Sequence, residues 1–177
     1  AVAPHDSDRV IAGTNAGSIF STATATSATS TTDWTRVEPR AGWVSSLTFD
    51  PVDPSTIYAT YAGFGGKHVW KSTDGAATWA AIDGSGDATL PDIPVHSLAV
   101  DPVRRDRLYL GTDLGVFVSL DGGAHWNVEN TGFPDVVTEW VTVAQGERGP
   151  AVYAFTHGRG AWRAELAPET RRRSVRR

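Results

Sequence analysis

The 177-residue sequence contains no cysteine and no methionine. The lack of cysteine excludes a disulfide framework and thiolate chemistry, although it does not fix the cellular compartment. The lack of any methionine, an initiator included, fits a fragment or a processed chain. No apolar run approaches the length that crosses a bilayer, and a formal net charge of −4 offers no basic surface for nucleic acid. We therefore expect neither a membrane nor a nucleic acid as partner.

Helical periodicity is also missing, because no window has apolar residues at the spacing of one helix face. The chain instead has 18 glycines and 10 prolines between short apolar runs rich in Val, Thr, Trp and Tyr. Such runs, bounded by turn residues, predict β-strands. The basic stretch "RRRSVRR" at 171–177 belongs to a segment, 167–177, that we interpret as a disordered tail.

Two hairpin sequences share one pattern. "HVWKSTDGAATWAAI" (68–82) and "GVFVSLDGGAHWNVE" (115–129) each place Asp-Gly between two strand-like runs and a tryptophan after the turn. The offset between the copies is 47 residues at both the serine and the tryptophan. The shared positions are Ser72, Asp74, Gly75 and Trp79 in the first copy, and Ser119, Asp121, Gly122 and Trp126 in the second.

The repeat extends over most of the chain. "SLTFDPVDPSTIYAT" (46–60) aligns with "SLAVDPVRRDRLYLGT" (97–112), and weaker copies occupy 3–14 and 137–166. In the last copy, Trp140 falls on the leucine position and Trp162 on that of Phe117. Each unit predicts four short strands, A to D, and a period near 45–50 residues is typical of β-propeller blades.

The predicted fold class is therefore all-β: a β-propeller of four-stranded antiparallel blades, about four of which are present. The predicted blades span about 1–40, 41–91, 92–134 and 135–166, within one domain, 1–166. The first unit lacks the glycine of the hairpin pattern and has a longer Ser/Thr-rich turn, interpreted as a mobile loop. The fourth lacks strand D.

Four blades make about half of a ring of roughly seven or eight. Exposed sheet edges invite pairing, so we expect a companion: an upstream part of the same propeller or a second copy of this chain. A closed ring of four blades is the alternative.

The pattern S-x-D-G-x-x-x-W resembles the Asp-box of BNR repeats, which occur in sialidases, xyloglucanase-type glycoside hydrolases and sortilin-like receptors. This resemblance covers nearly the whole chain and implies a propeller fold and, by analogy alone, a secreted protein. Because the family includes enzymes, receptors and assembly factors, it does not identify the activity.

No catalytic residue, metal site or cofactor is predicted. The two Asp-box aspartates are expected to cap their own turns, and each box tryptophan to be buried over its turn. The five histidines lack the spacing of a metal motif. Glycoside hydrolysis usually needs two facing carboxyls, and nothing in the sequence pairs them.

Ligand binding is instead expected on the propeller face that carries the B–C turns. Aromatic rings there could stack on sugar and basic groups could donate hydrogen bonds. The candidate residues are Tyr61, Phe64, Lys67, His68, Asp113, His157 and Arg159. The alternative is that 61–68 is a loose loop and that "HGRG" (157–160) has only a structural role.

Two functions follow. The leading hypothesis is a non-catalytic or incomplete BNR-type propeller that serves as a scaffold for glycan or protein. The alternative is the C-terminal half of an exported glycoside hydrolase, sialidase-like or xyloglucanase-like.

Overall fold

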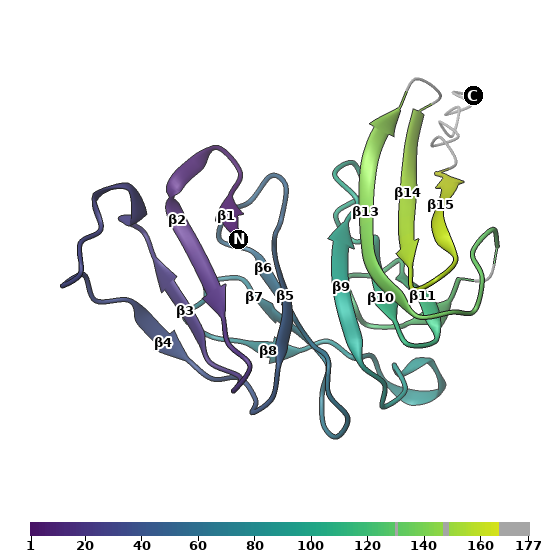
Figure 1. The fold of residues 1–177 in the computed structure, drawn as a ribbon, viewed down its shortest axis with the longest axis horizontal. Helices are drawn as coiled ribbons and strands as arrows, with labels where there is room; N and C mark the ends of the chain where they lie inside the picture. The colour runs from purple at the N-terminus through teal and green to yellow at the C-terminus, as the bar shows by residue number, and fades with distance from the viewer. Residues whose placement is uncertain (130, 147–148, 167–177) are drawn as a thin grey trace, which may run out of the picture.

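The structure is a computed structural model that describes residues 1–129, 131–146 and 149–166, so the predicted tail lies outside the described residues. These residues fold into four antiparallel sheets in sequence order and contain only two 3₁₀ turns, Ala25–Ser27 (η1) and Gly86–Ala88 (η2). The predicted all-β propeller architecture is confirmed. We call the sheets the first to fourth blade (Figure 1).

The strands follow one another across each sheet. The first blade contains β1 (Val2–Ala3), β2 (Asp6–Gly13), β3 (Ile19–Thr22) and β4 (Thr35–Val37). The second contains β5 (Val44–Phe49), β6 (Ile57–Tyr61), β7 (Val69–Ser72) and β8 (Ala80–Ala81). The third contains β9 (Val95–Val100), β10 (Leu108–Thr112), β11 (Gly115–Ser119) and β12 (Asn127–Val128). The fourth has three strands among the described residues: β13 (Thr138–Gly146), β14 (Gly149–Thr156) and β15 (Gly160–Glu165).

Strand A of each blade lies innermost. Residues of β1, β5, β9 and β13 together line an open hollow of about 320 Å³ on the inner side of the arc. Figure 1 shows the sheets fanning outward from these strands, with the first and fourth blades at opposite ends. The sheet faces at both ends carry exposed hydrophobic side chains, such as Val2 and Trp140. The described residues therefore form an open arc, and the alternative of a closed four-blade ring is wrong for this chain.

A β-bulge recurs at the start of strand A and sets the register of three blades. The extra residue is Ser45 in β5, His96 in β9 and Glu139 in β13. This bulge corrects one predicted alignment. Val141 pairs with Ala154 as Leu98 pairs with Leu110, so Val141, and not Trp140, takes the leucine position. The sequence register was off by one because a bulge adds a residue without any signature in the hydrophobic pattern.

Neighbouring blades bury sheet faces against each other. We call the face of a blade on the side of the preceding blade its front face, and the face on the side of the following blade its back face. The junction between the second and third blades is the largest core cluster. There Leu98, Leu110 and Phe117 from the front of the third blade pack with Tyr58 and Val69 from the back of the second. The fold is therefore held together mainly between sheets, as in other packed-sheet proteins.

The long turn of the first blade is tied to its own sheet at one point. Asp8 of β2 accepts hydrogen bonds from the backbone N–H of Thr26 at 2.9 Å and from its hydroxyl at 2.5 Å. These bonds lower the pKa of Asp8.

None of the helices in the described part of the chain is long and apolar enough to cross a membrane.

Candidate functional site

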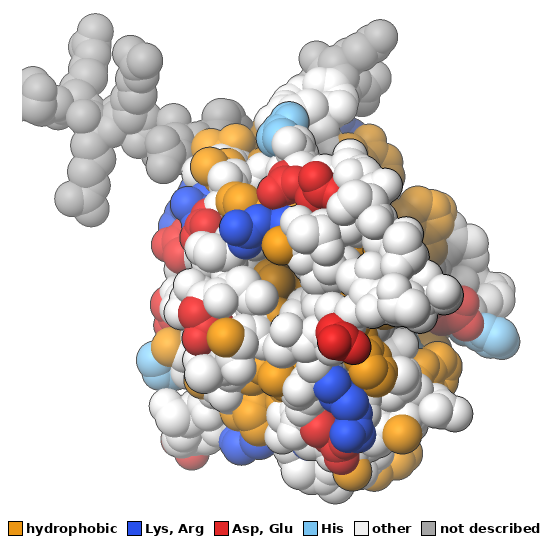
Figure 2. All heavy atoms as spheres, turned by 90° about the vertical axis from the view of Figure 1, so that its left-hand side faces the viewer, with side chains coloured by type: hydrophobic (Ala, Val, Ile, Leu, Met, Phe, Trp, Pro, Cys, Tyr) orange, Lys and Arg blue, Asp and Glu red, His pale blue; other side chains and the backbone are white. Residues whose placement is uncertain are grey.

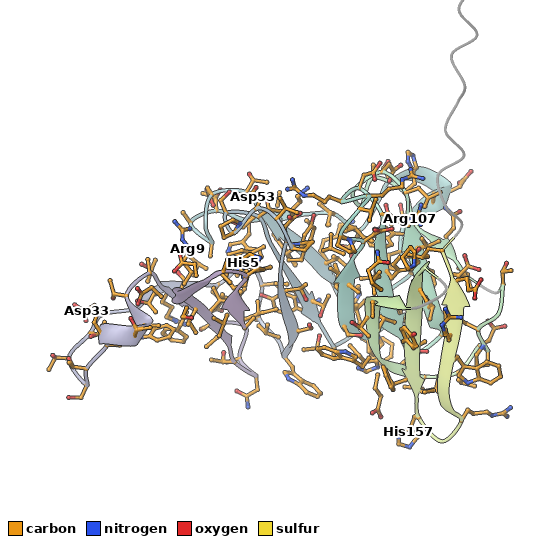
Figure 3. The ribbon with its side chains drawn as sticks, turned by 90° about the horizontal axis from the view of Figure 1, so that it is seen from above. His5, Arg9, Asp33, Asp53, Arg107 and His157 are labelled. Atoms are coloured by element: carbon orange, nitrogen blue, oxygen red, sulfur yellow. The ribbon has the colours of Figure 1, made fainter. Side chains whose placement is uncertain are left out.

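The turns of the blades separate onto two opposite ends of the arc. The C–D turns touch the A–B turns: the N–H of Gly75 donates to the carbonyl of Ser55 at 2.9 Å, and that of Gly122 to Asp106 at 2.7 Å. The B–C turns lie with the connections between blades at the other end, which we call the B–C face. In Figure 3, His157 on this face lies far from Asp53 and Arg107, which belong to A–B turns.

The two Asp-Gly hairpins have the same internal hydrogen bonds. Asp74 accepts bonds from the hydroxyl of Ser72 at 2.8 Å, from the N–H of Thr78 at 2.9 Å and from its hydroxyl at 2.5 Å. Asp121 is held in the same way by Ser119 and His125, whose Nδ1 lies 2.6 Å from Oδ2. Both carboxylates are thus occupied by their own turns.

These hydrogen bonds keep both carboxyl groups ionised. The Thr78 hydroxyl, then its N–H, lowers the pKa of Asp74 to about 2. The His125 side chain, then its N–H, lowers the pKa of Asp121 to about 2. A carboxylate that accepts several hydrogen bonds is a poor general acid or base near neutral pH, so this geometry suits a structural role.

The hairpin tryptophans act between blades rather than over their own turns alone. Trp126 is 3% exposed, and its indole N–H donates to the carbonyl of Ile82, in the second blade, at 2.7 Å. Trp79 is only partly buried and donates to Ala76 in its own turn at 3.2 Å, while its ring packs against the cluster that contains Ile19 of the first blade. The expected burial is confirmed for Trp126 and is wrong for Trp79, which is only partly buried. Sequence could not show the Trp126 hydrogen bond, because that contact is made across a blade boundary.

The B–C turn of the second blade, 61–68, contains two buried candidates. Tyr61 is fully buried, and its hydroxyl donates to the carbonyl of Gly17 at 3.3 Å. His68 is 1% exposed, with Nε2 at 2.9 Å from Asp92 Oδ1. We correct their predicted use: neither ring is accessible to a ligand, because the strand ends that carry them pack into the blade interfaces.

Phe64 lies at the tip of the same turn and is 69% exposed. Gly65 and Gly66, which follow it, have φ of 80° and 92°, a region that favours glycine. A Cβ added at Gly63 or Gly65 would meet no atom within 4 Å. The backbone around Phe64 is therefore open to solvent.

This open turn is fixed on both sides, so it is not a loose loop. Asp92, in the connection to the third blade, accepts a hydrogen bond from the N–H of Gly65 at 2.7 Å as well as contacting His68. The Gly65 N–H is the main cause of a lowered pKa at Asp92. From the other side, Arg40 Nη1 donates to the carbonyl of Lys67 at 2.7 Å.

Trp43 extends the exposed aromatic surface. It precedes β5, is 57% exposed, and its carbonyl accepts a hydrogen bond from the N–H of Ala62 at 3.1 Å. Sequence reasoning missed Trp43, Arg40 and Asp92 as site residues. In the sequence, Trp43 looks like part of an apolar strand. Arg40 and Asp92 lie in connections between blades, and the position of these connections depends on how the blades pack.

The remaining candidates lie in separate pairs on the third and fourth blades. Asp113 is 2.7 Å from Nε2 of His96, and His157 Nδ1 is 2.8 Å from Glu139 Oε1. In both blades one partner is the bulge residue of strand A and the other lies in the B–C turn. The bulge residue is the histidine in the third blade (His96) and the carboxylate in the fourth (Glu139). Arg159 is exposed, and its carbonyl accepts the Trp162 indole N–H at 3.1 Å.

The B–C face thus combines an exposed aromatic group, on a turn held by hydrogen bonds, with histidine–carboxylate pairs. It brings Phe64 and Lys67 together in one turn, and leaves Asp113, His157 and Arg159 on other blades. Within the described residues, no group of three or more His, Asp or Glu side chains is placed to hold a metal ion.

Comparison with known proteins bears on the fold. No family model matches the chain, and no curated protein matches it. Solved structures do: an ancestral GH74 enzyme has a TM-score of 0.62 and 22% identity, over 87% of this chain. The Niastella koreensis GH74 enzyme has a TM-score of 0.57 and 17% identity, over 88%. The GH74 xyloglucanase from Xanthomonas campestris has a TM-score of 0.56 and 17% identity, over 94%.

These likenesses define the class of protein as a propeller-type all-β fold, as in GH74 enzymes. The chain covers 21%, 25% and 30% of the three neighbouring chains, respectively. At these identities the comparison supports the fold and not the activity.

Proposed function

We propose that this chain is a sugar-binding part of a GH74-like propeller, and that it binds a polysaccharide chain on its B–C face. The observation that carries the proposal is Phe64, an exposed ring on a turn held by Arg40 on one side and Asp92 on the other. A turn whose backbone is already held loses less conformational entropy when a ligand stacks on the aromatic ring that it carries.

The chemistry around Phe64 suits a neutral sugar. The C–H face of a pyranose stacks on aromatic rings, and nearby donors orient its hydroxyl groups. Trp43 supplies a second exposed aromatic group beside the turn, and Lys67 an exposed cation. The likeness to GH74 enzymes, one of them a xyloglucanase, favours a β-glucan backbone over a sialylated glycan.

Bond cleavage is not proposed for the described residues alone. Glycoside hydrolysis needs one carboxyl to protonate the leaving oxygen and a second to activate water or attack the sugar. On the B–C face, Asp92, Asp113 and Glu139 each contact a histidine of the chain instead of facing one another. The chain would then supply binding surface to a hydrolase whose catalytic pair needs further residues. As part of the same proposal, this hydrolase is exported from the cell.

Titration of the chain with xyloglucan oligosaccharides tests the proposal. We expect amide shifts at Phe64, Lys67 and Gly65, with those of Asp74 and Asp121 unchanged. Phe64→Ala should weaken binding by roughly tenfold, about 1.4 kcal/mol. Val103→Ala is the matched control, because Val103 is similarly exposed, at 66%, but lies in an A–B turn at the other end of the arc.

Two results would contradict the proposal. Shifts confined to the hairpin turns of Asp74 and Asp121 would place the site at the wrong end of the arc. Binding of sialyllactose in preference to xyloglucan oligosaccharides would favour the sialidase-like alternative.

A further inference from the structure

A cavity of about 190 Å³ lies between the first and second blades. Its lining includes Ile11 and Ser21 from the back face of the first blade and Ile57 from the front face of the second. Pro54 and Gly75, from the A–B and C–D turns of the second blade, also line it, so the cavity is at the end of the arc opposite the B–C face. The first blade, which faces the viewer in Figure 2, separates the cavity from the open end of the arc.

The first blade departs from the other blades at one row of its back face, beside this cavity. By strand register, Ile11 takes the position of Tyr58 in the second blade and Tyr109 in the third. Both tyrosines are buried, at 1% and 5% exposure, in the cores that their blades share with the following blade. The cross-strand neighbour of Ile11 is Ser21, where the second blade has Lys71. The first blade therefore has an isoleucine and a serine where the second has a phenol ring and a long side chain.

A second difference lies at the A–B turns. Between the second and third blades, Arg105 crosses the junction and donates from Nε to Asp50 Oδ2 at 2.7 Å. In the repeat alignment, Pro54 of the second blade takes the position of Arg105, and Ala3 of the first takes that of Asp50. The junction of the first and second blades thus lacks the long side chain that fills the same place in the next junction. Smaller side chains leave space because the surrounding structure collapses only in part.

Polar groups of the first blade lie along the cavity. Among the described residues, Arg9 is the one charged residue of its lining, and Figure 3 shows Arg9 on the side of Asp53, far from His157. Its Nε is 3.3 Å from Oδ2 of Asp6, which is not part of the lining, and its side chain is 42% exposed. Ser21 and Thr35, which pair across β3 and β4, add two hydroxyl groups. The lining thus offers a positive charge and hydroxyl groups, and no acidic side chain.

We infer that this cavity binds a small aromatic carboxylate, a single ring of the hydroxybenzoate class. The ring lies against Ile11, Phe49 and Ile57, which are apolar and buried, near the place that a tyrosine ring fills in the other junctions. An engineered apolar cavity of about 150 Å³ binds benzene, so this cavity has room for one substituted ring. The carboxylate pairs with Arg9, whose planar guanidinium matches its two oxygens. This site is separate from the sugar-binding surface proposed around Phe64, because it lies at the other end of the arc.

Titration of the chain with 4-hydroxybenzoate tests the inference. We expect amide shifts at Ile11 and Gly75, on the two sides of the cavity. Arg9→Gln should weaken binding roughly tenfold or more, because it removes a charged hydrogen-bond donor for the carboxylate. Arg104→Gln is the matched control and should bind as the original chain does. Arg104 is a similarly exposed arginine beside an aspartate, Asp106, but it belongs to the A–B turn of the third blade and does not line the cavity.

A second variant fills the cavity. Ile11→Tyr gives the first blade the tyrosine that the second and third blades carry at this position, so we expect it to abolish binding of 4-hydroxybenzoate. Urea unfolding of the same variant should show a fold at least as stable as the original, because the added ring enters space that is already present.

Four outcomes would overturn the inference. Unchanged amide signals at Ile11 and Gly75 would show that the cavity takes no aromatic acid. Equal affinities of the Arg9→Gln and Arg104→Gln variants would show that Arg9 does not hold the carboxylate. Undiminished binding by a folded Ile11→Tyr variant would place the ligand outside the cavity. Tighter binding of glucose than of 4-hydroxybenzoate, with shifts at the same amides, would assign the cavity to a sugar.

Discussion

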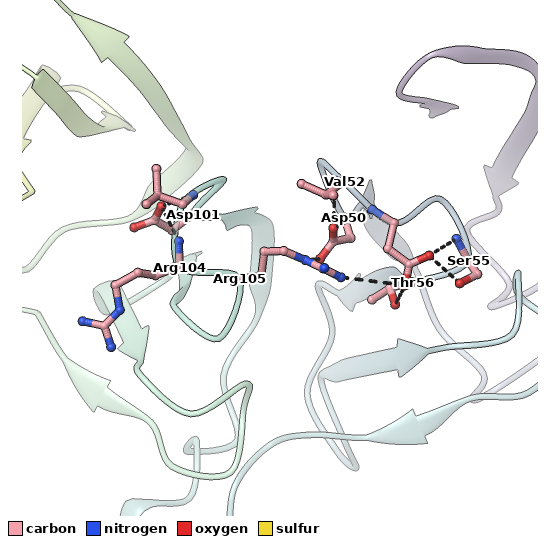
Figure 4. A network of polar contacts seen from close by, with 9 residues as sticks. Asp50, Val52, Ser55, Thr56, Asp101, Arg104 and Arg105 are labelled. Carbon is pink, nitrogen blue, oxygen red and sulfur yellow. Dashed lines mark hydrogen bonds and ion pairs between the residues drawn. The ribbon is translucent and has the colours of Figure 1, made fainter. Parts of the chain in front are cut away.

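Arg105 of the third blade donates a hydrogen bond from Nε to Oδ2 of Asp50 in the second blade, at 2.7 Å (Figure 4). Asp50 is 1% exposed, and the N–H groups of Val52 and Asp53 occupy its other oxygen. The pair raises the pKa of Arg105, chiefly through the hydrogen bond to Asp50. This hydrogen bond joins the A–B turns of the second and third blades, which are far apart in sequence.

Removal of this arginine should destabilise the junction. Arg105→Ala leaves a buried carboxylate without its cation, and we expect a loss of about 1–3 kcal/mol in the free energy of unfolding, measured with urea. Asp53→Asn is the control, because Asp53 Oδ2 is 3.7 Å from the guanidinium and partly exposed. An equal loss of unfolding free energy in both variants would show that the buried Arg105–Asp50 pair does not contribute more than the exposed Arg105–Asp53 pair.

The two hairpin tryptophans should differ in their contributions. Trp126→Ala should cost about 3–5 kcal/mol, as truncation of a large buried side chain does. Trp79→Ala should cost less, because that ring is only partly buried. Chemical denaturation of both variants checks the order, and a loss below about 1 kcal/mol for Trp126→Ala would show that this ring is not part of the core.

Stability should fall in acid because of the hairpin aspartates. The pKa of Asp74 and of Asp121 is about 2 in the fold, below the value of roughly 3.9 in an unfolded chain. A lowered folded pKa stabilises the fold above the unfolded value, and this contribution is lost as the pH falls from roughly 4 to 2. Thermal midpoints measured from pH 2 to 6 should drop in that window, and the drop should be smaller in the D74N/D121N double variant. An unchanged pH profile in that variant would assign the acid sensitivity to other groups.

Two glycines should respond oppositely to the same substitution. Gly111→Ala pushes a Cβ to 2.6 Å from the Thr138 carbonyl oxygen at the junction of the third and fourth blades, so we expect a loss of about 1–3 kcal/mol. Gly63→Ala meets no atom within 4 Å and should leave stability within about 0.5 kcal/mol of the original. Urea unfolding distinguishes them. A neutral Gly111→Ala would mean that the fourth blade can move away from the third without cost.

The sequence by itself determined the repeat, the strand-rich blades and the hairpins. These features are local: a Ser-x-Asp-Gly turn closes through bonds within seven residues, from Ser72 to Thr78, so its geometry is encoded where it forms. Phe64 and Lys67 could also be proposed from sequence, since a glycine-rich turn between strands has to lie on the surface.

The tertiary structure decided the rest, because it depends on contacts between blades. The sequence suggested Tyr61 and His68 as ligand-binding residues, but both side chains are buried where blades pack together. The bulge that moves Trp140 off the leucine position changes the face on which it lies, since one extra residue reverses the alternation of side chains along a strand. Arg40 and Asp92 became part of the candidate site only when the connections between blades were placed beside the turn that carries Phe64. Such relationships join residues about 27 positions apart through packing, and no local pattern in a single sequence records them.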